Sequence, residues 1–516
     1  MSLQSHRPPG YSGKRERYLP SLARDLERRL RRSQGSLTYD SLRLPEGKLG
    51  ELASVLVEFA EDIHNDIGIW ASLERYNIES WGTPLPFVLQ PNEDMGPSPI
   101  NEYRVKHLLW VLYSELNPRL VLSPTHRDLN QLAASISDFL VERFAEIPRV
   151  SNVKAFLAQP NTFGWDVKRK LIWLGIHSYL FRNTFLNYVE DHGGEAGIPV
   201  IDDFICQETT IWSGLGVIDV LAAALDITEE QRADLRSWYE RHHAYYRVLS
   251  IEGHRMEVQN TINGEPYTVR TGHDGRQFEV GAIILGSLVP WNGEWYWSGE
   301  QSILGNIAED ALQKLRDSFL RQAPQIAYRY CRQLYEKAGA MAKVHHEKFI
   351  RYHGDDLVVY PDGLSMSADL QREARLQWES KPREVIARLM EEHRLQNPWP
   401  SLSFPRDLVE NKNGVGVYHN PDEGWEMMTG FNNIVNGLRK KGAGLTRDEE
   451  DALRSFIWSE NVSPRFVMRM VREYGYESIE SAFLIRGSPD ETYLDYLLRR
   501  YKGAYYRRRC PRVALL

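Results

Sequence analysis

Two pairs of glutamate and histidine have the spacing of metal ligands on a helix: Glu61 with His64, and Glu240 with His243. Residues three apart share one helix face, and helical bundles combine two such pairs with two further carboxylates to hold a di-metal centre. More acids surround the first pair: Glu58, Asp62 and Asp66. Because the chain has 15 histidines among abundant glutamates, about one such pair is expected by chance. Solvated helix faces are therefore the favoured interpretation of both pairs.

A second candidate is Asp362 followed by Glu379 and Lys381. These residues loosely resemble the Asp and Glu-x-Lys of metal-dependent nucleases, in which carboxylates hold Mg²⁺ and lysine helps to position the attacking water. Such residues project from adjacent strands, whereas residues 368–378 have the hydrophobic period of a helix and Pro382 follows closely. The sequence context therefore argues against a nuclease site.

Histidines and aspartates also gather shortly before the second candidate. The members of this group are His345, His346, His353, Asp355 and Asp356. The zinc-binding pattern His-Glu-x-x-His fails here, because Ile350 stands where the second histidine would be. A polar helix end is favoured over a metal site.

The sequence lacks motifs for cofactor binding and for nucleophilic catalysis. It has no Gly-x-x-x-x-Gly-Lys-Ser/Thr loop and no Gly-x-Ser-x-Gly turn, and residues 214–216 (Gly-Leu-Gly) lack the third glycine of a dinucleotide fingerprint. The three cysteines, Cys206, Cys331 and Cys510, have no pairing or zinc-ligand spacing, which favours a reducing compartment. We predict no cofactor and no metal, name no catalytic residue, and leave open whether the protein is an enzyme.

The C-terminal segment interleaves basic and aromatic side chains. Lysine and arginine neutralise phosphates while tyrosine rings stack on exposed bases, and these are the two elements of single-strand binding. The candidate nucleic-acid-binding residues are Arg499, Arg500, Tyr501, Lys502, Tyr505, Tyr506, Arg507, Arg508 and Arg509. The same pattern also describes an amphipathic terminal helix packed on its own domain, which is the structural alternative.

With 42% hydrophobic and 26% charged residues among its 516 positions, the chain has the composition of a globular protein. Its net charge of −7 gives no overall attraction to nucleic acid, although both ends are basic. The first residues lack the apolar segment of a secretory signal, and the most apolar stretch, residues 216–227, is too short to cross a membrane. We expect a cytoplasmic protein that binds nucleic acid or an acidic protein partner and no membrane. Its oligomeric state is left open.

Residues 245–299 depart from the helical pattern of the other regions. Short apolar segments there mostly alternate with residues that can face water, which is the two-residue period of strands. Four tight-turn dipeptides separate them: Glu252-Gly253, Asn263-Gly264, Asp274-Gly275 and Asn292-Gly293. Gly281 and Gly286 would allow the sharp bends that closure of a small barrel requires. We predict an α+β protein, predominantly α-helical and multi-domain, with one small five-stranded β-barrel of the SH3 or OB type.

These patterns predict five parts of the chain. They are a basic N-terminal arm (1–40), a helical domain (41–244), the barrel (245–300), a helical segment with one short strand and an irregular connection (301–412), and a C-terminal helical domain with the basic tail (413–516). The short strand is expected within residues 356–363. Thr228 and Gln231 have the spacing of a capping box, which predicts the start of a helix that runs to about His243.

Three stretches carry a resemblance to known sequences. They are residues 161–182 (NTFGWDVKRKLIWLGIHSYLFR), 288–299 (LVPWNGEWYWSG) and 418–485, with HNPDEG, LRKKGAGLT, SPRFV and SAFLI. Together they resemble a bacterial family known only as a domain of unknown function, over most of the chain. Since that family has no established activity, the resemblance implies a bacterial cytosolic protein and transfers no functional residue.

These patterns favour a protein that binds rather than catalyses, with nucleic acid as the first partner to test. The motivation is the barrel, the two basic ends and the tail. Exposed barrel residues that could contribute are His254, Arg255, Arg270, His273 and Trp291. A metal-dependent enzyme, either nuclease-like or with a di-metal helical site, is the first alternative. A structural or regulatory scaffold is the second.

Overall fold

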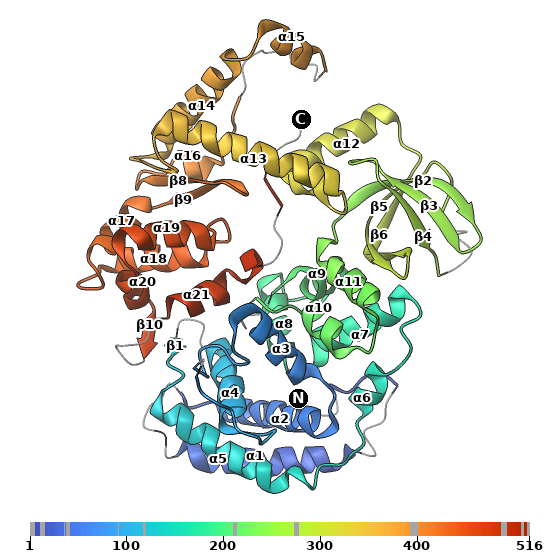
Figure 1. Ribbon diagram of the computed structural model, residues 1–516, viewed down its shortest axis with the longest axis vertical. Helices are drawn as coiled ribbons and strands as arrows, with labels where there is room; N and C mark the ends of the chain where they lie inside the picture. The colour runs from blue at the N-terminus through green and yellow to red at the C-terminus, as the bar shows by residue number, and fades with distance from the viewer. Residues whose placement is uncertain are drawn as a thin grey trace. The chain divides into compact units, whose positions relative to one another are not determined.

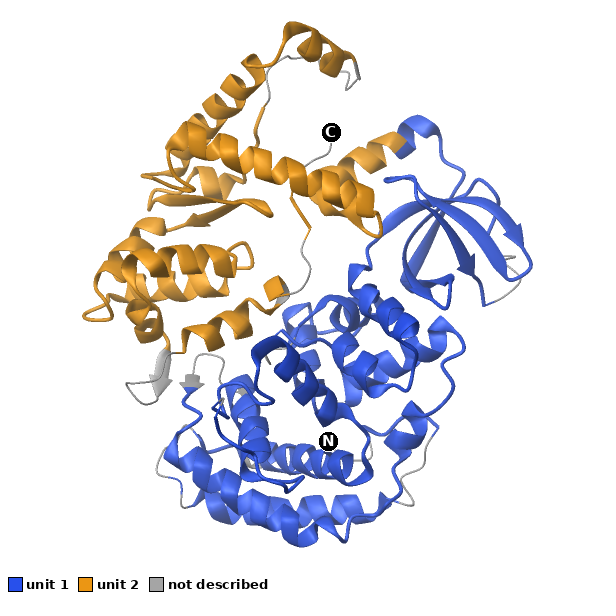
Figure 2. Ribbon diagram, in the orientation of Figure 1, with its two compact units in different colours: residues 1–312, 484–491 blue, residues 313–483, 492–516 orange. Residues whose placement is uncertain are grey.

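The computed structural model divides the chain into two compact units, coloured separately in Figure 2. The first contains residues 1–312 and 484–491, and the second contains residues 313–483 and 492–516. The described residues are 6–10, 16–35, 37, 42–90, 92–116, 120–209, 214–272, 278–392, 401–486, 493–506 and 510–512. No helix among these residues is both long and apolar enough to cross a membrane.

The first unit begins with a series of helices (Figure 1). They are α1 (Tyr18–Gln34), α2 (Glu46–Asn65), α3 (Ile69–Trp81), α4 (Glu102–Leu116), α5 (Arg127–Phe144), α6 (Asn152–Leu157), α7 (Gly164–His177), α8 (Arg182–Asp191), α9 (Ile198–Gln207), α10 (Val217–Ala224) and α11 (Glu229–Ser237). Leu22, Leu26 and Leu30 recur at helical spacing along α1, and all three are buried. The basic N-terminal segment is thus packed into the helical layer against α2 and α5.

The predicted capping box at Thr228 is confirmed at the start of α11. The Thr228 hydroxyl accepts the Gln231 amide at 3.2 Å, and the Gln231 side chain accepts the Thr228 amide at 3.0 Å. The helix ends earlier than predicted, at Ser237, and a 3-10 turn, η4 (Trp238–Glu240), follows. The physical reason is that Trp238 turns inward, where its indole donates to the Pro290 carbonyl at 2.7 Å.

The predicted five-stranded barrel is confirmed. Its strands are β2 (Ala244–Glu252), β3 (Arg255–Asn260), β4 (Pro266–Arg270), β5 (Ile283–Trp291) and β6 (Glu294–Gly305). They close in the order β2-β3-β4-β6-β5, and every neighbouring pair is antiparallel except β4 with β6. That parallel contact has a single register pair, Val269 with Trp295. Alternate residues such as Met256, Val258 and Val269 fill the interior, as the period of two predicts.

The predicted turns explain how the strands reverse. Asn292 and Gly293 both have positive φ, 52° and 75°, which is the backbone of a type I′ hairpin turn. Gly286 lies where the register of β5 with β6 shifts, and a Cβ there would stand 2.8 Å from the Trp297 ring. The close approach of ring to backbone therefore requires glycine. The predicted turn at Asp274-Gly275 lies outside the described residues.

The second unit combines helices with a small sheet. In chain order its elements are α12 (Glu309–Gln322, which contains the unit boundary), η5 (Pro324–Tyr328), α13 (Arg332–His353), β7 (Leu357–Tyr360), α14 (Gly363–Glu379), α15 (Arg383–Glu392), α16 (Arg406–Val409), β8 (Val415–Asn420), β9 (Gly424–Thr429), α17 (Phe431–Arg439), α18 (Arg447–Trp458), α19 (Pro464–Tyr474), α20 (Glu477–Ala482), α21 (Leu494–Tyr501) and η6 (Gly503–Tyr506). A short parallel pair, β1 (Leu120–Leu122) with β10 (Leu484–Arg486), belongs to the first unit.

The sheet of the second unit is antiparallel, in the order β7-β8-β9. The strand expected within residues 356–363 is confirmed as β7, but β8 and β9 lie within residues 413–516, where the sequence predicted a helical domain. For β8 the reason is that all six of its residues are buried. A strand covered on both faces shows no alternation of apolar and polar residues, so the period of two is lost.

Two glycines of the second unit provide a stability test. A Cβ at Gly363 would lie 1.9 Å from the Leu408 carbonyl oxygen, a backbone atom of α16, whereas a Cβ at Gly339, inside α13, would meet nothing within 4 Å. We expect Gly363→Ala to lower the free energy of unfolding by roughly 1–3 kcal/mol through overpacking. Gly339→Ala should raise it by roughly 0.5–1 kcal/mol, since alanine favours helix. Urea denaturation of both variants checks the prediction; equal effects would contradict it.

Candidate ligand-binding site

The first candidate metal pair, Glu61 and His64, is held in separate structural contacts. Glu61 accepts a hydrogen bond from Arg7 at 2.8 Å, and Arg7 also pairs with Glu16 at 3.0 Å. The His64 ring meets the Phe144 ring edge-on, with 4.8 Å between their centroids. Burial raises the pKa of Glu61 to about 7, although Arg7 opposes this shift.

The acids around this pair also have structural partners. Glu58 pairs with Arg182 at 2.6 Å. Asp62 accepts the backbone amides of Gly68 and Trp70, at 2.9 and 2.7 Å, and the Tyr179 hydroxyl at 2.7 Å. Its carboxylate thus satisfies free amides at the start of α3.

The second pair, Glu240 and His243, does not lie on one helix face, because the chain leaves the 3-10 turn at Glu240 and enters β2 at Ala244. The helical prediction for this pair is therefore wrong. Among the described residues, no three His, Cys, Asp or Glu side chains come together as a metal site requires.

The nuclease-like residues are far apart along α14. Asp362 caps the start of that helix, accepting the Ser365 amide at 2.7 Å. Glu379 is the last residue of the same helix, 17 residues long, so about 25 Å separates the two ends. Lys381 lies over the Trp378 ring at 4.7 Å. These side chains cannot hold one ion together in this structure.

The histidine and aspartate group divides between different neighbours. His353 lies 3.2 Å from Glu373 on α14. Asp355 and Asp356 instead pair with Arg469 of α19, at 3.2 and 3.0 Å. The group therefore joins α13 and the start of β7 to two other helices, which agrees with the polar helix end favoured from the sequence.

The tail residues that the structure describes pack onto α18. Arg500 and Lys502 are buried, and the Lys502 ammonium donates to the carbonyls of Phe456 (3.4 Å) and Ser459 at the end of α18. The Tyr505 hydroxyl donates to the Glu460 carbonyl at 2.7 Å. The other described candidates are Arg499, Tyr501 and Tyr506, on or just after α21. Arg499 lies 3.7 Å from the Asp495 carboxylate, and the Tyr501 ring packs against the rings of Trp458 and Phe483. Tyr506 is exposed. Arg507, Arg508 and Arg509 lie outside the described residues.

Lys502 therefore caps the C-terminal end of α18, where a cation satisfies free carbonyls and meets the negative end of the helix dipole. We expect Lys502→Met, which keeps the length of the side chain, to lower the free energy of unfolding by roughly 1.5–3 kcal/mol. The exposed Lys337 of α13 supplies the matched control, Lys337→Met. An unchanged urea midpoint for Lys502→Met would contradict the capping role.

The raised pKa of Glu61 makes a contribution to stability that depends on pH. Its native pKa of about 7 exceeds the ordinary value of 4.5, so between these pH values the native state holds a proton that the unfolded state has released. The stability that Glu61 contributes therefore falls as pH rises through this window, by up to about 3 kcal/mol. The difference in unfolding free energy between the wild type and Glu61→Gln should show this slope, and Glu229→Gln, at an exposed carboxyl, should not.

A cavity of about 220 Å³ lies between α7 and the barrel, inside the first unit. Its aromatic lining comes from Trp165, Trp238, Phe278, Tyr296 and Trp297. Two basic side chains, Lys168 and Arg270, also line it. A single water needs roughly 10–15 Å³, so this cavity has room for a ring system.

The mouth of the cavity is made where α7 begins. Gly164 lets the helix approach the barrel, because a Cβ there would stand 2.6 Å from the Tyr296 ring. Trp165 is 42% exposed and meets the Tyr296 ring edge-on at 5.3 Å. Phe163 lies beside it at 4.8 Å, and the Arg270 guanidinium stands over the Phe163 ring at 5.2 Å. An exposed indole is thus presented next to a cation.

Lys168 is held by the buried carboxylate of Asp202 and by the Ser298 hydroxyl, 2.7 Å away. Asp202 also pairs with Arg241 at 3.1 Å. The Cys206 thiol lies 3.4 Å from the Lys168 ammonium, yet burial raises the pKa of this thiol to about 11. The thiol is therefore protonated at neutral pH and is not an activated nucleophile.

The charges at the barrel side of the mouth do not balance. Glu294 accepts Arg270 at 2.5 Å and Arg255 at 2.9 Å, so two cations share one carboxylate. Arg255 is 61% exposed at its side chain. One positive charge is left over beside the aromatic surface, which suits an anionic ligand.

Sequence reasoning identified only part of this site. Arg255 and Arg270 were expected on the barrel surface and lie there, whereas Trp291 was expected to be exposed and is buried, with its indole bonded to the Asn161 carbonyl at 2.9 Å. His273 lies outside the described residues. Trp165 and Lys168 were missed, although both stand in the stretch at 161–182 that carried the resemblance.

Comparison with known families gives one match. Residues 44–196 match the model of a family described as a protein of unknown function (DUF3843). The matched range includes α7 and ends before the barrel. No curated protein and no solved structure matches the chain. The match agrees with the resemblance to an uncharacterised family and assigns no activity.

Proposed function

We propose that the protein binds single-stranded nucleic acid, with one nucleotide unit held in the cavity between α7 and the barrel. A base stacks on the exposed Trp165, and its phosphate meets Arg270 and Arg255. The observation that carries the proposal is the exposed indole placed beside an unbalanced positive charge. Aromatic stacking combined with phosphate neutralisation is the general mode of single-strand recognition.

The dimensions and charge support a ligand of one unit at this cavity. The volume of about 220 Å³ is below the roughly 300–1,000 Å³ of sites for drug-sized molecules. The single excess cation matches one phosphate, so the salt dependence contributed by this cavity is that of about one released counterion. The buried tail residues Arg500 and Lys502 are already bonded within their own domain and are not part of this proposal.

Fluorescence anisotropy of a labelled single-stranded oligothymidine, at low and at high salt, tests the proposal. Trp165→Ala should weaken binding roughly 5- to 150-fold, since stacking contributes roughly 1–3 kcal/mol per base. Arg270→Ala should weaken it as well and reduce the slope of log K against log salt concentration by about one. Calorimetry with a nucleoside monophosphate distinguishes a free nucleotide from a polymer as the preferred ligand.

Matched controls are available in the second unit. Tyr476 is an exposed aromatic residue and Arg332 is an arginine with an 88% exposed side chain, so Tyr476→Ala and Arg332→Ala remove the same chemistry elsewhere. Both variants should bind like the wild type. The proposal would be wrong if the wild type did not bind the oligonucleotide at low salt, or if the control variants lost as much affinity as Trp165→Ala and Arg270→Ala.

A further inference from the structure

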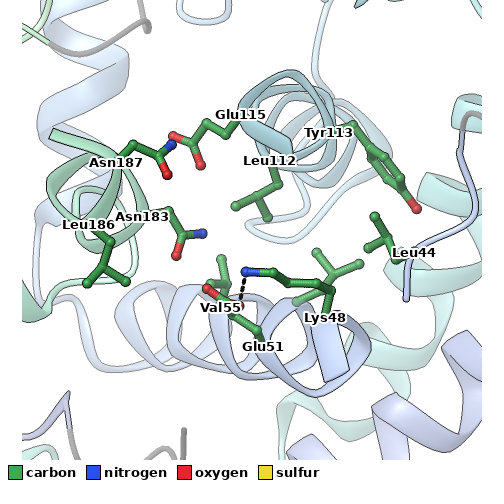
Figure 3. Close-up of a pocket in the computed structure, with 11 residues that line it drawn as sticks. Leu44, Lys48, Glu51, Val55, Leu112, Tyr113, Glu115, Asn183, Leu186 and Asn187 are labelled. Carbon is green, nitrogen blue, oxygen red and sulfur yellow. Dashed lines mark hydrogen bonds and ion pairs between the residues drawn. The ribbon is translucent and has the colours of Figure 1, made fainter. Parts of the chain in front are cut away.

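Two further cavities differ greatly in size. One lies between α2, α4 and α8 in the first unit, and Figure 3 shows the side chains that line it. Its volume of about 90 Å³ admits a molecule of only a few heavy atoms. The other cavity lies in the second unit and has a volume of about 850 Å³, which is large enough for a segment of polymer.

The large cavity is a groove along β9, the last strand in the order β7-β8-β9. All six residues of this strand line it. Residues 402–405 form one wall, on the face of the sheet that carries the Trp425 side chain. Ser459 and Asn461 form the other wall, on the face of Glu426, whose carboxylate accepts the backbone amide two positions after Asn461. Because both faces of β9 contribute, the groove follows the edge of the sheet.

The hydrogen bonds of the sheet show which backbone groups of β9 point into this groove. Residue pairs on antiparallel strands alternate between bonded and non-bonded pairs. The His419 amide donates to the Asp356 carbonyl at 2.8 Å, so the backbone groups of His419 point toward β7, and its pair with Trp425 is a non-bonded one. By the same alternation, Met427 and Thr429 form non-bonded pairs with β8. All three residues of β9 therefore direct their N–H and C=O groups away from the sheet.

These outward groups form an edge that is open to pairing. In the described part of the chain, no residue bonds to the outward N–H or C=O groups of Trp425, Met427 and Thr429. Natural edge strands are commonly protected by lysine, proline or a bulge. β9 contains neither lysine nor proline, and its register with β8 has no shift. The opposite edge strand, β7, has only four residues and is followed directly by Pro361.

We propose that the groove binds an extended peptide segment of a partner protein, which adds to β9 as a fourth strand. Alternating donors and acceptors along one edge match the backbone of an extended chain. Six residues of strand span roughly 20 Å. The groove and the barrel cavity share no lining residue, so the proposal is independent of nucleic-acid binding.

The two walls specify the side chains of the peptide. One wall is apolar, since Phe404 lies there beside Trp425 and Met427. The other wall is polar, with Ser459 and Asn461. Because successive side chains of a strand point to opposite faces, the peptide alternates apolar and polar residues.

A labelled peptide with three threonine-valine repeats between terminal lysines tests the proposal by fluorescence anisotropy with the full-length chain. It should bind with saturation. Two N-methylated forms are compared with it, one methylated at the three valines and the other at the three threonines. Each form lacks the donors of one peptide edge, and only one edge can face β9. One form should therefore lose about tenfold or more in affinity, and the other should bind like the unmodified peptide.

Two protein variants test the place of binding. Ser403 and Asn461 are exposed residues on opposite walls, so Ser403→Trp and Asn461→Trp should each obstruct the groove and abolish binding without disturbing the core. Ser380 is exposed and does not line the groove, so Ser380→Trp should leave binding unchanged.

The proposal would be overturned if the unmodified peptide did not bind, or if both methylated forms bound equally. Undiminished binding by both groove variants would also overturn it. Sedimentation of the full-length chain provides a further check. A dimer that Ser403→Trp and Asn461→Trp dissociate would show that a second copy, and not a partner peptide, occupies the groove.

Discussion

The buried carboxylate of Asp202 is the contact on which the barrel cavity depends. It accepts Lys168 from α7, Arg241 from the turn before β2, and the Ser298 hydroxyl from β6 at 3.0 Å. Asp202, a residue of α9, thus contacts both α7 and the barrel. The neighbouring Gly299 has a φ of 75°, and a Cβ there would stand 2.7 Å from the same carboxylate. The backbone of β6 is therefore shaped to admit this charge.

Such a buried group is not expected to add much net stability. Removing ions from water is costly, so a buried pair is often no better than apolar packing, while loss of one partner typically costs roughly 3–5 kcal/mol. For Asp202, two cations and one hydroxyl meet at one carboxylate, which links Lys168 of α7 to Ser298 of β6. Its loss would leave Lys168 and Arg241 without their shared carboxylate.

The features that could be predicted from sequence are those with local causes. The capping box at Thr228, the type I′ turn at Asn292-Gly293 and the period of two in the barrel all arise from residues near one another in the chain. The strand β8 could not be recognised, because burial on both faces removes alternation. The cavity could not be assembled for a different reason. Lys168 and Ser298 are 130 positions apart, and no local pattern records their contact.

An ion pair lies at the place where the barrel closes between β4 and β6. Between β4 and β6 there is one register pair, Val269 with Trp295, and the ion pair of Arg270 with Glu294 lies directly beside it. The Arg270 guanidinium, which lines the cavity, thus also stabilises the contact between β4 and β6, the strand pair with a single register pair. An anion that bound Arg270 in place of Glu294 would replace the ion pair between β4 and β6 with a contact to the ligand. Binding of such an anion would then be thermodynamically linked to the contact between β4 and β6, so that each changes the free energy of the other.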